Sequence, residues 1–311
     1  MLFRSDEAEA APHACLGVVA NGVGQYDKGV EEFEHALTRQ PDSEAAYLGL
    51  AGAYQGLGQN DKAEEIFRRA IALRPAYWLG YSRLGAFYYA QARYGESEQM
   101  FTQVVALNPD SWRGYSNLGA LYFAQGRVNE AIAAFERSLA IRPNYLAASN
   151  LGTLYFFEQQ DYEKAAGAFR RAIALSGEEY VPWGNYAMAL EWSGQKDEAR
   201  SAYRRAADLA EAARRVNAKE ASVQMSLAEY YAALGDMSRA TMLMHSALAL
   251  EPENPRLYYQ AAVMEEHRLG HRDESLKWLR SAIEKGYSRQ QIERSPSLAA
   301  LREDPRFRKL Q

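Results

Sequence analysis

Two histidines near the C-terminal end of the 311-residue chain are spaced as metal ligands could be. His267 and His271 are four residues apart, which places two imidazoles on one face of a helix, and Glu265 and Glu266 precede them. Gly270 falls between the histidines at a turn, however, and the sequence contains no HExxH motif. We therefore expect structural or solvent-exposed roles for both histidines and predict no metal site.

The other residue types that could do chemistry also lack partners. The segment NGVG at 21–24 is rich in glycine, but no predicted strand precedes it, as a phosphate-binding loop requires. Cys15 is the only cysteine; it lies on the apolar side of a predicted helix, where we expect it to be buried and free. No Ser–His–Asp set, pair of catalytic acids or cofactor motif can be assembled. The sequence thus predicts a protein that is not an enzyme and binds no cofactor.

The composition is that of a soluble globular protein, with 48% hydrophobic and 24% charged residues. A formal net charge of −4 argues against nucleic acid as a partner, because proteins that bind its backbone are usually strongly basic. The longest apolar run is far below the ~20 residues that span a bilayer, and no signal segment opens the chain. A single cysteine suits a reducing compartment. We expect a cytoplasmic protein with no nucleic-acid or membrane partner.

An internal repeat organises the chain. Prolines recur every 34 residues, at Pro41, Pro75, Pro109 and Pro143. Other columns keep the same period: Leu50, Leu84 and Leu118; Tyr54, Tyr88 and Tyr122; Phe67, Phe101 and Phe135. Each unit contains two stretches with apolar residues at helical spacing, separated by a polar turn that usually contains glycine. In the unit 112–145, small residues such as Gly119 and Ala131 are expected to let the two helices approach around Phe135.

This unit resembles the tetratricopeptide repeat (TPR). The residues that match are Tyr115, Leu118, Gly119, Tyr122, Ala131, Phe135 and Pro143. The resemblance implies an all-α fold, a right-handed α-solenoid of about eight helix–turn–helix units with a C-terminal cap. We place the units at 10–43, 44–77, 78–111, 112–145, 146–179, 180–213, 221–254 and 256–289, and the cap at 290–311.

Several departures from the repeat carry structural expectations. The fifth unit is one residue longer than the fourth between its conserved glycine and phenylalanine, so we expect an enlarged inner turn. No glycine or proline occurs from Lys196 to Met225, which predicts a long second helix in the sixth unit. Leu298, Leu301 and Phe307 in the tail are expected to cover the last repeat.

The resemblance also implies where a ligand would bind. In TPR proteins the first helices line the concave surface, and the sixth position of each helix points into it. That column reads Arg83, Asn117, Asn150 and Asn185. A side-chain amide donates and accepts at once, so it can pair with an extended peptide of any sequence. The row resembles the asparagine ladder with which the repeats of O-GlcNAc transferase hold a peptide, although solvated asparagines are the alternative.

A second column supplies aromatic residues six positions further along. Tyr89, Phe123 and Phe156 form a stripe, which Glu191 and Trp192 continue. We expect these aromatic side chains to be exposed, because Tyr88, Tyr122 and Tyr155 already occupy the packing column. The carboxylate clamp of chaperone-binding repeats needs Lys and Asn at set positions, where this chain has Ser82, Ala86, Ser116 and Ala120. The sequence therefore disfavours a C-terminal carboxylate as the ligand.

We thus expect a non-catalytic module that binds a protein or an extended peptide in its concave groove. The tail resembles the C-terminal repeats of bacterial signalling proteins that carry a kinase, a cyclase or a winged-helix domain, so we expect a regulatory or scaffolding part of such a protein. Two alternatives stay open: a stand-alone assembly scaffold, and the substrate-recruiting region of an enzyme. Residues 1–9 are expected to be disordered and in part artefactual, because MLFRS resembles a translated adapter tail.

Overall fold

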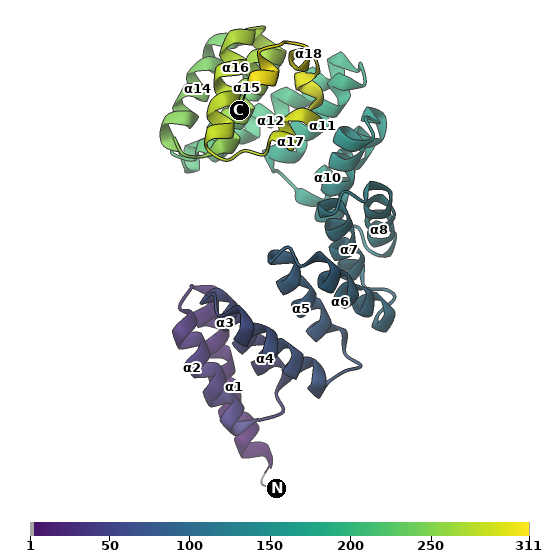
Figure 1. Ribbon diagram of the computed structural model, residues 1–311, viewed down its shortest axis with the longest axis vertical. Coiled ribbons are helices and arrows are strands. Elements are labelled where there is room, and N and C mark those ends of the chain that lie inside the picture. The colour runs from purple at the N-terminus through teal and green to yellow at the C-terminus, as the bar shows by residue number, and fades with distance from the viewer. Residues whose placement is uncertain (1–2, 311) are drawn as a thin grey trace. The chain divides into compact units, whose positions relative to one another are not determined.

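The protein folds as consecutive pairs of antiparallel helices (Figure 1). The structure is a computed structural model that describes the backbone of residues 3–310 and the side chains of residues 10–310. Within this range it contains helices and turns and no strand. The chain divides into two compact units, residues 1–142 and 143–311. The predicted all-α fold of about eight TPR helix pairs is thereby confirmed.

The N-terminal unit contains four helix pairs. They are α1 (Phe3–Gly22) with α2 (Tyr26–Arg39), α3 (Glu44–Gly56) with α4 (Asn60–Leu73), α5 (Trp78–Ala90) with α6 (Tyr94–Leu107), and α7 (Trp112–Ala124) with α8 (Val128–Ile141). Helix α1 includes part of the segment 1–9 for which we expect disorder, while residues 1, 2 and 311 lie outside the described residues.

The C-terminal unit contains four further pairs and the cap. The pairs are α9 (Tyr145–Thr153) and η1 (Leu154–Glu158) with α10 (Tyr162–Ser176), α11 (Tyr180–Trp192) with α12 (Lys196–Val216), α13 (Ala221–Leu234) with α14 (Met237–Leu250), and α15 (Pro255–Met264) and η2 (Glu265–Leu269) with α16 (Arg272–Glu284). The cap comprises α17 (Arg289–Arg294), η3 (Pro296–Leu298), α18 (Ala299–Arg302) and η4 (Phe307–Lys309). Helix α12 has 21 residues, so the predicted long second helix is confirmed.

Close packing of small against large side chains holds each pair together. A Cβ atom added at Gly119 would lie 2.8 Å from Cδ1 of Phe135, which is itself fully buried. The same contact recurs between Gly85 and Phe101, at 2.7 Å from Cε1, and between Gly152 and Phe169, at 2.6 Å from Cε1. A larger residue at these glycines would therefore displace the phenylalanine on which the pair depends.

The turn inside each pair requires a left-handed residue. Glycine supplies it in most repeats, for example Gly126 with φ of 74°. Ala92 takes the equivalent place in the third pair with φ of 56°, where its Cβ atom is strained. We expect Ala92→Gly to stabilise the protein by about 0.5–1 kcal/mol in urea unfolding, and Gly126→Ala to destabilise it by about 1 kcal/mol. Equal unfolding midpoints for Ala92→Gly and the parent would contradict this account of the turn.

Two first helices end in a π-helical turn, η1 and η2. In the fourth repeat the closing hydrogen bond runs from the Arg127 amide to the Tyr122 carbonyl, whereas in the fifth it runs from Asp161 to Tyr155, one residue further. The extra residue of the fifth unit, predicted to enlarge the turn, is thus absorbed as a wider last turn of the helix. The π turn changes which side chains beyond it face inward.

The prediction that Cys15 is buried is wrong, since it is exposed on α1. Helix α1 packs against α2 and α3 through a narrow stripe of small residues that includes Gly17 and Ala20. Leu16 and Val19 are exposed with Cys15. The apolar pattern of α1 is broader than the face that its two neighbours cover.

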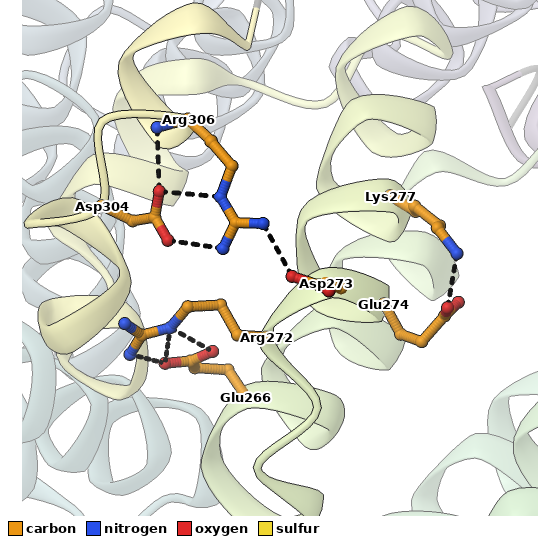
Figure 2. Close-up of polar contacts among 7 residues, drawn as sticks. All are labelled: Glu266, Arg272, Asp273, Glu274, Lys277, Asp304 and Arg306. Atoms are coloured by element: carbon orange, nitrogen blue, oxygen red, sulfur yellow. Dashed lines mark hydrogen bonds and ion pairs between the residues drawn. The ribbon is translucent and has the colours of Figure 1, made fainter.

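The tail packs on the last helix pair. Ile292, Leu298, Leu301, Phe307 and Leu310 are buried in one cluster with Ala262, Leu276 and Leu279. Figure 2 shows polar contacts that hold the same segment: Arg306 bonds to Asp304 at 2.8 and 3.0 Å and reaches Asp273 of α16 at 2.7 Å. The Arg306 guanidinium and a backbone hydrogen bond lower the pKa of Asp304 to about 2. The cap is therefore tied to α16 by both apolar and ionic contacts.

Candidate functional site

The sixth residue of each of the first helices α5, α7, α9 and α11 is polar. In the N-terminal unit this residue is Arg83 on α5 and Asn117 on α7. Arg83 is exposed and Asn117 is partly exposed. Among the described residues, neither side chain has a hydrogen-bond or ion-pair partner. Both polar groups are therefore available to a ligand.

In the C-terminal unit the corresponding residues are Asn150 on α9 and Asn185 on α11. Both are partly exposed, and no described residue bonds to either amide. The sixth residues of α13 and α15 are Ser226 and Gln260. The sequence did not single out these two residues, because the extra residues between α12 and α13 break the 34-residue spacing. Counting from the first residue of each helix, and not from the repeated prolines, identifies both Ser226 and Gln260.

The aromatic stripe is only partly exposed. Tyr89 has 38% of its surface exposed and Phe123 is partly exposed. The prediction that Phe156 is exposed is wrong: its side chain is 0% exposed. The π turn η1 rotates Phe156 inward, where its ring lies 5.1 Å from Tyr162 and 6.0 Å from Trp192, and leaves Phe157 at the surface. Phe156 therefore supports Trp192 and is closed to a ligand.

A cavity of about 550 Å³ lies between the first helices α11, α13 and α15 of the C-terminal unit. Asn185, Ser226 and Gln260 all line it, and so does Trp192. The ninth residues of the same helices, Met188, Glu229 and Val263, form a second row of lining residues. Tyr180, Tyr203 and Tyr230 add aromatic surface. A volume of this size lies within the range of small-molecule sites and can hold a side chain of a ligand.

A bridge between α11 and η2 bounds the cavity. Both guanidinium nitrogens Nη1 and Nη2 of Arg268 donate to the Glu191 carboxylate, and Nη2 also donates to Tyr203 Oη at 3.0 Å. Beside this ion pair the rings of Trp192 and His267 stack, with centroids 5.4 Å apart. The bridge joins the sixth and eighth repeats directly. Ser297 of the cap also lines the cavity, so the tail contributes to the site.

The bridge fixes the charge of its members. Burial alone would raise the pKa of Glu191, but the hydrogen bonds and positive charge of Arg268 outweigh it and lower that pKa. Burial and the nearby Arg268 lower the pKa of His267, partly opposed by Glu191. At neutral pH the bridge therefore consists of a charged Glu191–Arg268 pair and a neutral imidazole.

Of the described residues that line the cavity, Glu229 is the only one with a carboxylate. Gln260 Nε2 donates to its Oε1 at 3.1 Å, and no other described residue bonds or ion-pairs with it. Burial raises the pKa of Glu229 to about 7, although the Gln260 hydrogen bond and the charges of Arg268 and Arg256 oppose the shift. A carboxylate with so few partners in a cavity can accept a hydrogen bond or a cation from a ligand.

The two histidines singled out in the sequence lie in different surroundings. His267 stacks on Trp192, while Nδ1 of His271 lies 3.0 Å from Glu265 Oε2. Within the part of the chain whose side chains are described, no group of three or more His, Cys, Asp or Glu residues could hold a metal ion. Nor is any described helix long and apolar enough to cross a membrane.

Comparisons of structure place this fold among known ones. A tetratricopeptide repeat protein from Parabacteroides merdae is 18% identical with a TM-score of 0.60, covering 81% of this chain and 96% of that one. The structure of pilF from Pseudomonas aeruginosa is 20% identical with a TM-score of 0.57, covering 73% and 98%. The APC/C hetero-tetramer Cut9–Hcn1 is 17% identical with a TM-score of 0.58, covering 78% of this chain and 47% of that one. At these identities the likeness concerns the fold alone.

Sequence comparisons identify the family. A search of curated proteins found no match. Models of the tetratricopeptide repeat match residues 21–84, 79–144, 113–178 and 180–212, together more than half of the chain. Such repeats are generally non-catalytic modules for protein–protein interaction, and they imply a protein or peptide partner. The chain therefore belongs to the tetratricopeptide repeat family.

Proposed function

We propose that the protein binds an extended segment of a partner protein along the first helices of its repeats, with the cavity between α11, α13 and α15 as the principal site. The observation that carries this proposal is that the sixth residues of three successive first helices, Asn185, Ser226 and Gln260, line one cavity. Amide and hydroxyl groups in a row can pair with successive peptide groups of a ligand.

The remaining groove residues have supporting roles in this proposal. Asn150 extends the row within the C-terminal unit, and Trp192 offers an aromatic surface to a ligand side chain. Arg83, Asn117, Tyr89 and Phe123 form the corresponding surface of the N-terminal unit. Phe156 has no part in it, because it is buried.

The wider role that we propose is a regulatory or scaffolding one in a bacterial signalling protein in the cytoplasm. It rests on the resemblance of the tail to the C-terminal repeats of such proteins. The gene sequence around this reading frame tests it: a kinase, cyclase or winged-helix domain in the same chain is the expected result, and a chain of repeats alone would favour the stand-alone scaffold.

Replacement of the free asparagines tests the groove. Peptides selected from a random library on the parent protein are titrated against Asn150→Ala, Asn185→Ala and the double variant. Each change removes one net hydrogen bond, so we expect losses of about 0.5–1.5 kcal/mol singly and about 1–3 kcal/mol together. Folding stability should change little, since no described residue bonds to either amide.

Asn129→Ala is the matched control, because Asn129 is exposed on the second helix α8. Affinity that is unchanged in the double variant, or reduced equally in the control, would show that the asparagines are solvated and that peptides bind elsewhere.

A further inference from the structure

The shape of the cavity limits how a peptide can enter it. Trp192, His267 and Arg268 stand near the C-terminal ends of α11 and η2, where the stacked rings and the Glu191–Arg268 ion pair join the two helices. Trp192, His267 and Arg268 all line the cavity, so a ligand group that reaches this end meets the bridge. The cavity therefore suits a side chain or a chain terminus that enters and stops.

The polar groups inside the cavity select the charge of that group. The Glu191 carboxylate compensates the charge of Arg268, whose Nη2 lies 2.6 Å from Glu191 Oε2. Arg268 therefore offers no uncompensated positive charge to a ligand. Arg256, which also lines the cavity, is exposed on the first turn of α15. Glu229 lines the cavity with a single bond from Gln260, which leaves acceptor positions of its carboxylate open.

The remaining surface is of a kind that attracts cations. Trp192, Tyr180, Tyr203 and Tyr230 line the cavity, and aromatic faces stabilise a nearby ammonium group through their quadrupoles. Gly184 permits this arrangement, since a Cβ atom there would lie 2.3 Å from Tyr230 Oη. An open carboxylate among aromatic rings is complementary to a positive group that can donate several hydrogen bonds.

We propose that the cavity receives a primary ammonium group of the bound partner, held by the Glu229 carboxylate and flanked by Trp192 and Tyr230. This inference rests on the proposed peptide-binding function and specifies its ligand. Two sources offer the same chemistry, a lysine side chain and the amino terminus of a chain, and the experiment below has an arm for each. Among the described residues, only Gln260 forms a hydrogen bond with the Glu229 carboxylate.

The test uses four tetrapeptides titrated into the full chain by calorimetry. The first is acetylated, amidated and carries one lysine; the second has norleucine in place of the lysine, and the third has glutamate. The fourth contains only alanine and has a free amino terminus. Because a charge-assisted hydrogen bond contributes about 1.5–3 kcal/mol, we expect an ammonium-bearing peptide to bind about ten- to a hundredfold more tightly than the norleucine peptide.

Glu229→Gln should abolish this preference, because it keeps the size of the side chain and removes its charge. Glu284→Gln is the matched control, on the exposed face of α16. A norleucine peptide that binds as tightly as both the lysine peptide and the peptide with a free amino terminus would overturn the ammonium site and leave peptide binding intact. Tightest binding of the glutamate peptide would overturn it in favour of an anion at Arg256. Failure of all four peptides to bind would overturn both this inference and the proposed function.

A second measurement needs no variant. At pH 7 an ammonium group bound to Glu229 should displace about half a proton from this carboxyl group, whose pKa is about 7. The other titratable groups that line the cavity or interact with Glu229 do not titrate there. Tyr180, Tyr203, Tyr230 and Tyr259 have raised pKa values, His267 has a lowered one, and the guanidinium groups of Arg256 and Arg268 are cations. Calorimetry in two buffers of different ionisation enthalpy measures the released proton. Tighter binding of the lysine peptide than of the norleucine peptide, without proton release, would overturn the contact with Glu229.

Discussion

Removal of residues 290–311 is expected to destabilise the C-terminal unit by about 5 kcal/mol or more and to cause aggregation. The deletion removes five buried apolar side chains of the cap, each of which contributes about 1.5–3 kcal/mol when buried, and it exposes Leu276 and Leu279 of the last pair. Urea unfolding and light scattering measure the two effects. Ser297 also leaves the cavity, so peptide affinity should fall as well.

Two single changes show whether burial is the cause. Leu298→Ala, at a fully buried position, should cost about 2–5 kcal/mol, whereas Arg308→Ala, at an exposed one, should cost almost nothing. A truncated protein that stays monomeric and unfolds at the same urea concentration as the parent would show that the cap is an appendage without a structural role.

Glu229→Gln is expected to stabilise the protein at pH 8 and to leave its stability unchanged near pH 4. The pKa of Glu229 rises from an ordinary value of 4.5 to about 7 in the folded state. The unfolded chain therefore loses this proton first, and folding becomes less favourable as the pH rises from 4.5 to 7. Above pH 7 the ionised Glu229 destabilises the folded state by up to about 3 kcal/mol. Water that enters the cavity and solvates the carboxylate reduces this cost. Glutamine cannot ionise and avoids this cost.

The measurement is the difference in unfolding free energy between Glu229→Gln and the parent, from pH 4 to pH 8. All other titrations are common to both proteins and cancel in this difference. Glu284→Gln, which changes an exposed carboxylate, should give a flat difference. Parallel stability profiles for Glu229→Gln and the parent would mean that the Glu229 carboxylate is well solvated.

Much of the fold could be predicted from the sequence because it is local and periodic. The contact between Gly119 and Phe135 forms within one helix–turn–helix unit. Because equivalent residues recur every 34 positions, the periodicity of the sequence predicts this contact. Asn185 was found in the same way, from its position in its helix. The fold class is confirmed for these reasons, whereas the role of the groove residues stays a prediction.

The parts of the site that the sequence did not reveal depend on breaks in the period or on distant contacts. A single extra residue, absorbed in η1, turned Phe156 from an exposed position to a buried one. The extra residues before α13 moved Ser226 and Gln260 off the spacing of the prolines. The partner of Glu191 is Arg268, 77 residues away, and no local pattern connects them. The open carboxylate of Glu229 is likewise visible only once three helices surround it.

The bridge between α11 and η2 has a consequence for how this repeat array loses its structure. Repeat proteins are usually described as a one-dimensional series of elements coupled only to their nearest neighbours, so that they can unfold one element at a time from an end. The Glu191–Arg268 pair and the Trp192–His267 stack add a coupling between second neighbours. The eighth repeat cannot leave the seventh without also leaving the sixth. The last three repeats of the chain should therefore melt as one cooperative block, and hydrogen exchange in α11, α13 and α15 should share one opening free energy.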